Sequence, residues 1–188
     1  MTTKTCIFTL LLTAGLSNSH AQDTWTQKAD FGGTARYAAV AFSIGSKGYI
    51  GTGSDASTVR KDFWEYDPAT DTWTQKADFR GAARNGAASF SIGSKGYVAT
   101  GADATSSFRK DLWEYDPTTN TWTRKADVGG APRYEAVGFS IGSKGYIGTG
   151  TEIGSNVQDI WEYDPTTNSW TQKQTTVVVL VVTPPDSV

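Results

Sequence analysis

Arginine recurs in this chain at a spacing that could build a binding site. Arg36, Arg84 and Arg133 each open a similar segment, and a guanidinium group binds carboxylates through paired hydrogen bonds. Brought together at one end of a repetitive fold, they would form a positive ring suited to a carboxylate or an acidic sugar. In the alternative, each arginine braces its own repeat by bonding loop carbonyl groups. We prefer this second interpretation, because the residue recurs in every repeat.

The residues that follow these arginines differ between the copies, so they are the candidates for specificity. They are Tyr37, Asn85 and the pair Tyr134-Glu135. Glu135 is the ionisable group among them that lies next to an arginine and could exchange a proton with a ligand. We therefore predict a binding site without an assigned catalytic residue, composed of Arg36, Tyr37, Arg84, Asn85, Arg133, Tyr134 and Glu135.

The first twenty-one residues resemble a secretory signal. Lys4 precedes an apolar run over 6–16, and Ser19 and Ala21 place small residues where a signal peptidase cleaves. The alternatives are a buried strand or a short membrane helix, but the run is too short to span a bilayer. The sequence therefore predicts cleavage after Ala21 and a secreted or periplasmic protein.

Cleavage at that point would remove several chemistries. The single Cys6, His20 and Met1 all precede the cleavage point. Without them the chain has no thiol nucleophile, no disulfide and no imidazole base or ligand. We expect no metal and no cofactor.

Carboxylates remain as candidate ligands or ion-pair partners. Six loop carboxylates could hold calcium, but they lack the dense spacing of a dedicated site. We interpret them as solvated loop acids and turn caps: Asp55, Asp62, Asp103, Asp111, Glu152 and Asp159. Glu65, Glu114 and Glu162 lie within predicted strands and are expected to pair with lysine or arginine on a neighbouring strand.

The elements that position these residues repeat along the chain. Trp25, Trp73, Trp122 and Trp170 are separated by 48, 49 and 48 residues, and the hairpin pattern of 63–73 returns at 112–122 and 160–170. Each repeat contains four strand candidates; the first of the opening repeat runs from Arg36 to Ile44 and is predicted to be buried on both faces. Four antiparallel strands per repeat indicate an all-β propeller rather than a β-sandwich.

The repeats resemble the kelch family. Its blade places glycine, tyrosine and tryptophan as in Gly53, Tyr66 and Trp73, and this pattern covers about residues 23 to 173. One departure is that the family's double glycine is replaced by Gly51-Thr52-Gly53 and its counterparts. Some kelch-like propellers are copper oxidases, but the mature chain lacks the histidine and cysteine that their site requires.

The repeats predict three blades in an incomplete ring. The expected blades cover 35–76, 83–125 and 132–173 within a propeller segment of 22–174, followed by a tail or linker over 175–188. An extra strand over 23–28 precedes the first blade. Two chains could close a six-blade ring as a homodimer, since closed propellers have about 4–8 blades.

These features favour an exported module that is not an enzyme. It would bind a protein or glycan through the long, variable loops, which are expected to lie together at one end of the blades. The alternatives are a sugar-modifying enzyme similar to the kelch-type sialic acid mutarotases, or a non-functional fragment of a larger propeller. The net charge of −2, without any basic run, predicts no nucleic-acid partner. No apolar run is long enough for a membrane span.

Overall fold

The computed structural model describes residues 24–173, which form three four-stranded antiparallel sheets. The predicted signal peptide, 1–21, and the predicted tail, 175–188, lie outside the described residues. Blade 1 contains β1 (Val40–Ile44), β2 (Lys47–Gly51), β3 (Phe63–Asp67) and β4 (Thr72–Lys76). Blade 2 contains β6 (Ala88–Ile92), β7 (Lys95–Ala99), β9 (Leu112–Asp116) and β10 (Thr121–Lys125). Blade 3 contains β11 (Val137–Ile141), β12 (Lys144–Gly148), β15 (Ile160–Asp164) and β16 (Ser169–Lys173).

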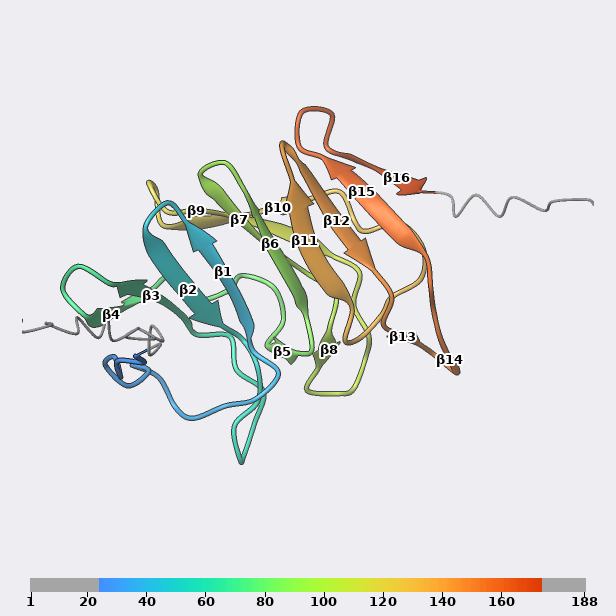
Figure 1. Cartoon of the computed structure of the whole chain (residues 1–188). Coiled ribbons are helices and arrows are strands. Elements are labelled where there is room, and N and C mark those ends of the chain that lie inside the picture. The colour runs from blue at the N-terminus through green and yellow to red at the C-terminus, as the bar shows by residue number, and fades with distance from the viewer. Residues whose placement is uncertain (1–23, 174–188) are drawn as a thin grey trace, which may run out of the picture.

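The three blades lie side by side, with their first strands, β1, β6 and β11, next to one another (Figure 1). Each blade runs antiparallel from its first to its fourth strand in chain order. This arrangement confirms the predicted all-β propeller fold. No helix among residues 24–173 is long and apolar enough to cross a membrane.

Two kinds of connection separate the ends of each blade. The first two strands are joined by tight turns, with Gly45, Gly93 and Gly142 at positive φ. The longer connections lie at the opposite end, the lower end in Figure 1, with the short strands that they contain. These strands are β5 (Arg84–Asn85), β8 (Ala102–Asp103), β13 (Thr151–Glu152) and β14 (Ser155–Asn156). We call this end of the blades, with its long connections and short strands, the long-loop rim. The variable residues Tyr37, Asn85 and Tyr134 lie at this end.

The core of the protein lies between the blades. The Phe63 ring of blade 1 lies edge-on to Tyr115 and Trp122 of blade 2, with ring centroids 4.8 and 4.9 Å apart. All three side chains are at most 5% exposed. The repeated aromatic hairpin is therefore scaffold that joins one blade to the next, rather than a binding motif.

A second repeated contact ties each blade to the segment that enters it. Asn120 Oδ1 accepts hydrogen bonds from Ala77 N and Tyr115 OH, both 2.9 Å long. Trp122 Nε1 donates to the carbonyl oxygen of Ala77 at 3.1 Å. Asp71 and Asn168 make the same contacts to Ala29 and Ala126, and all three acceptor residues have positive φ. Asparagine and aspartate tolerate this left-handed conformation better than most residues.

Two expectations about strands need correction. The first strand of blade 1 begins at Val40 instead of Arg36, because Ala38 has φ of 51° and interrupts the extended backbone. It is not buried on both faces, since Ala41 and Ser43 are exposed. The extra strand predicted over 23–28 is not formed by its described part, 24–28, and Trp25 is 97% exposed. The described residues include no preceding blade with which this segment could pair.

Candidate functional site

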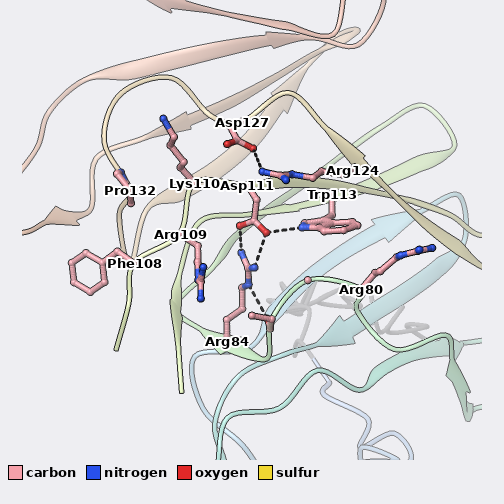
Figure 2. Close-up of a pocket in the computed structure, with 12 residues that line it drawn as sticks. Arg80, Arg84, Phe108, Arg109, Lys110, Asp111, Trp113, Arg124, Asp127 and Pro132 are labelled. Carbon is pink, nitrogen blue, oxygen red and sulfur yellow. Dashed lines mark hydrogen bonds and ion pairs between the residues drawn. The ribbon is translucent and has the colours of Figure 1, made fainter. Parts of the chain in front are cut away.

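Each predicted site arginine is bonded within its own blade. Figure 2 shows the blade 2 example, in which Arg84 donates to both carboxylate oxygens of Asp111 at 2.6 and 2.8 Å. Arg84 also donates to the carbonyl oxygen of Thr100 at 2.9 Å. Trp113 Nε1 donates to Asp111 at 2.7 Å. The guanidinium group thus joins the entry segment of the blade to the start of its third strand.

The other two blades repeat this unit. Arg36 makes two 2.7 Å bonds to Asp62, and Arg133 makes bonds of 2.5 and 2.9 Å to Asp159. Arg133 donates further to Glu152 at 3.1 Å. The arginine side chains are at most 3% exposed. Their hydrogen-bonding capacity is therefore directed into the blade, and the structure brings no free guanidinium of theirs to the rim.

The aspartates of these units differ from the solvated loop acids expected from the sequence. Hydrogen bonds from Arg133 lower the pKa of Asp159 below its usual value, against the opposing effect of burial. Burial alone would raise the pKa of Asp111, but the Arg84 contacts outweigh it and the net pKa is lowered. Asp62, Asp111 and Asp159 are therefore ionised anchors of a partly buried network. In the sequence, each of these arginines is followed by an aspartate 26 or 27 residues later, and this recurring spacing could have indicated the ion pairs.

The expectation for the strand glutamates is confirmed. Glu114 pairs with Lys125 at 3.1 Å and Glu162 with Lys173 at 2.9 Å, each across neighbouring strands. Glu65 lies 3.6 Å from Lys76. Each glutamate also accepts a bond of 2.6 or 2.7 Å from a strand tyrosine: Tyr49, Tyr97 or Tyr146. These three carboxylates therefore stabilise the blades through contacts with lysine and tyrosine on neighbouring strands.

The variable residues after the arginines lie together at the inner edge of the long-loop rim. Tyr37 is 65% exposed, and Asn85 Nδ2 donates to Ser54 Oγ at 2.6 Å. Tyr134 stacks on Phe108 with ring centroids 5.8 Å apart. Burial raises the pKa of Tyr134, and the neighbouring Glu135 carboxylate adds to this effect. Binding by these residues remains a prediction.

Glu135 occupies an unusual backbone position. It is exposed and has φ of 56°, as Ala38 and Gly86 have φ of 51° and 57° at the equivalent positions. Glu135 N donates to Gly86 O at 2.8 Å, and Gly86 N donates to Ala38 O at 3.0 Å. This chain of bonds crosses from blade to blade beside the first strands. A left-handed conformation is uncommon for glutamate, and it recurs at this position in all three blades. What distinguishes blade 3 here is the exposed carboxylate of Glu135.

A polar cavity of about 390 Å³ opens between blades 1 and 2 at this rim. Tyr37 and Asn85 line it together with Ser54, Asp55 and Asp103. Its size lies within the range of small-molecule sites, about 300–1,000 Å³. Asp55 is paired with Arg60, and Asp103 with Arg109. The cavity therefore presents hydroxyl and amide groups beside ion-paired carboxylates, which suits a polyhydroxylated ligand.

A second cavity, of about 440 Å³, lies on the side of blade 2 and is rich in cations. Figure 2 shows Arg80, Arg109, Lys110 and Arg124 around it, with Arg124 bonded to Asp127. Glycine and glutamine replace Arg80 and Arg124 in the other blades, at Gly32, Gln75, Gly129 and Gln172. The residues that line this cavity come from four separate segments, so no sequence pattern groups them.

No protein-family model matches the chain, and no curated protein matches it. Solved structures do match, 158 chains in all. One is the structure of YjhT, with a TM-score of 0.72 and 20% sequence identity over 82% of this chain and 56% of that one. The comparison and the antiparallel sheets fit a kelch-like propeller. The chain thus spans little more than half the length of the structure that it resembles.

The comparison corrects the expectation that the chain is not an enzyme. YjhT is a kelch-type sialic acid mutarotase, so the similar structure belongs to an enzyme and contradicts that expectation. The likeness at 20% identity concerns the fold.

Proposed function

We propose that this chain is part of a kelch-type, sugar-modifying enzyme that interconverts the anomers of an acidic sugar at the long-loop rim. The observation that carries the proposal is the placement of Glu135, an exposed carboxylate with left-handed backbone at the inner edge of that rim. The likeness to YjhT supports the fold for such an activity and suggests the substrate class. The polar cavity beside Tyr37 and Asn85 supports a sugar as the ligand.

Anomer exchange needs the sugar ring to open and close again, with two proton transfers in each direction. The Glu135 carboxylate would take the proton of the anomeric hydroxyl as the bond between the anomeric carbon and the ring oxygen breaks. The electron pair of the O–H bond forms the new carbonyl group, and the ring oxygen takes a proton from a neighbouring hydroxyl such as that of Tyr134. Closure on the other face of the carbonyl reverses both transfers, so no oxidant or cofactor is consumed.

The arginines have a positioning role in this proposal. Their guanidinium groups are bonded to Asp62, Asp111 and Asp159, so they support the backbone that carries Tyr37, Asn85 and Tyr134. This differs from a positive ring that binds the substrate carboxylate directly.

The test is magnetisation exchange by NMR between the α and β anomers of N-acetylneuraminic acid, with the purified full chain. We expect faster exchange with the wild-type chain than in buffer, and loss of that acceleration in Glu135→Gln. Glu135→Gly is a useful companion, because glycine accepts the positive φ and already occupies the equivalent position 86. Arg124→Gln is the matched control, since glutamine stands there in the other blades.

Two results would refute the proposal. One is the absence of acceleration by a folded wild-type chain at any concentration tested. The other is full acceleration by Glu135→Gln, which would show that the carboxylate carries no proton in the reaction. Circular dichroism of every variant separates loss of activity from loss of fold.

A further inference from the structure

The junction between neighbouring blades occurs twice in this chain with the same parts. At the first junction the Phe42 ring of blade 1 fills the space above Gly96 of blade 2, so closely that a Cβ atom on Gly96 would overlap the ring. At the second junction, Phe90 fills the space above Gly145 in the same way. One junction thus consists of a phenylalanine from a first strand and a glycine from the second strand of the next blade.

The same two junctions share their backbone hydrogen bonds. Next to the first strands, Gly86 N bonds to Ala38 O, and Glu135 N bonds to Gly86 O, at 3.0 and 2.8 Å. Towards the long-loop rim, Gly53 N bonds to Arg84 O and Gly101 N bonds to Arg133 O, at 2.8 and 2.9 Å. Each junction therefore combines an apolar contact with two backbone bonds of fixed direction.

Blade 3 presents the first half of this junction to solvent. Val137 is 58% exposed, Phe139 41% and Ile141 64%. In blade 1, the equivalent strand is covered by blade 2, and its Val40 and Ile44 are only 2% and 9% exposed. Ile160, at 37%, likewise corresponds to the fully buried Phe63 and Leu112. This flank is an exposed apolar surface, of the kind that marks an interaction site.

Blade 1 presents the second half. Among residues 24–173, a Cβ atom on Gly48 would have one neighbour within 4 Å, the Cβ atom of Tyr66 at 3.8 Å. No side chain of the described residues therefore fills the space that Phe42 and Phe90 fill at the two internal junctions. Ile50 is partly exposed, whereas its counterparts Val98 and Ile147 are fully buried.

We propose that these two flanks pair between two copies of this chain and close a six-blade ring. Phe139 of each copy would fill the space above Gly48 of the other, as Phe42 does at Gly96. Ala38 N would donate to Glu135 O, and Gly150 N to Arg36 O, across each contact. The occupant is a second copy because this chain itself carries both complementary halves of a junction that it forms twice internally. Six blades lie within the usual range of closed propellers, about 4–8.

A two-fold axis that coincides with the central axis of the propeller would relate the two copies. The two contacts between them would then be equivalent, and the ring would close without a free flank. Blade 1 already has its entry segment in place, with Ala29 bonded to Asp71 and Trp73. The contact therefore needs only residues that the structure describes.

The experiment measures the mass of the purified full chain by light scattering coupled to size exclusion, under reducing conditions. We expect twice the 20.2 kDa of one chain, constant over a tenfold range of protein concentration. Gly48→Phe fills the space that Phe139 needs, and it should give the mass of one chain. Gly48 does not have positive φ, so phenylalanine is compatible with its backbone, and circular dichroism should match that of the wild type.

Ser46→Phe is the matched control, since it adds the same ring at the exposed turn before Gly48; its mass should remain that of the pair. A wild-type chain with the mass of one copy would overturn the proposal. A mass that rises with concentration would also overturn it, because it indicates open assembly. The same holds if Gly48→Phe is folded and still paired. None of these results depends on the sugar activity, so the two proposals fail separately.

Discussion

Arg84 and Asp111 form a two-point ion pair, with N–O distances of 2.6 and 2.8 Å, across 27 residues of sequence. The arginine side chain is 1% exposed and the aspartate 17%. A planar guanidinium suits this geometry because two of its nitrogens donate in parallel, whereas a lysine ammonium has a single nitrogen and lacks this fork. The pair fixes the entry segment of blade 2 against the start of β9.

Arg84→Ala should lower the free energy of unfolding by about 3–5 kcal/mol, because it leaves Asp111 partly buried without its partner. Arg84→Lys should recover only part of this loss. Urea denaturation followed by tryptophan fluorescence measures both. Arg124→Gln breaks an exposed ion pair and should leave the urea midpoint unchanged; an equal loss in the two variants would contradict the structural role of Arg84.

Acid should destabilise the protein through the same aspartates. The pKa values of Asp111 and Asp159 are lowered in the folded state, so their contribution is fully present above the unfolded pKa of about 4. It is lost as the pH falls through the lower folded values. Urea midpoints should thus be steady at neutral pH and fall below about pH 4. Asp111→Asn should be less stable at pH 7 and show a shallower acid decline; an unchanged slope would exclude Asp111 as a contributor.

Asn120 tests the contact between an entry segment and its blade. Asn120→Gly keeps the left-handed backbone but removes the acceptor for Ala77 N and Tyr115 OH, and should cost about 1–3 kcal/mol. Asn120→Asp should be tolerated, since Asp71 accepts the equivalent bonds in blade 1. Thermal melting of both variants is sufficient. Equal melting temperatures for Asn120→Gly and the wild type would show that these bonds contribute no stability.

Gly96 tests the blade junction inside the chain. Gly96→Ala places a methyl group against the Phe42 ring and should cost about 1–3 kcal/mol. Phe42→Ala alone should also destabilise the protein by loss of packing. The double variant should be more stable than the sum of the two losses implies, because the smaller residue at 42 makes room for the methyl group. Strict additivity in this double-mutant cycle would mean that the two residues do not contact.

The sequence was sufficient for the strand pattern and for several contacts. The tryptophan period and the hairpin pattern of 63–73 place β3 and β4, and the strand glutamates pair with lysine as expected. The Arg–Asp pairs were missed because their partners lie 26 or 27 residues apart, in separate segments of the chain. The left-handed backbone at Ala38 and Glu135 could not be predicted for another reason: neither residue type signals this conformation, which accompanies the chain of inter-blade bonds.

The unequal surroundings of the three blades have a consequence for how the protein unfolds. Within residues 24–173, blade 2 has a blade on both flanks, whereas blades 1 and 3 each have a blade on one flank. In a linear array whose units are stabilised by nearest neighbours, opening begins at the ends and the middle unit opens last. Amide exchange in a single copy should therefore be slowest in β6 and β7. Closure into a ring would make every blade a middle blade, so that the two-copy assembly unfolds as one cooperative unit.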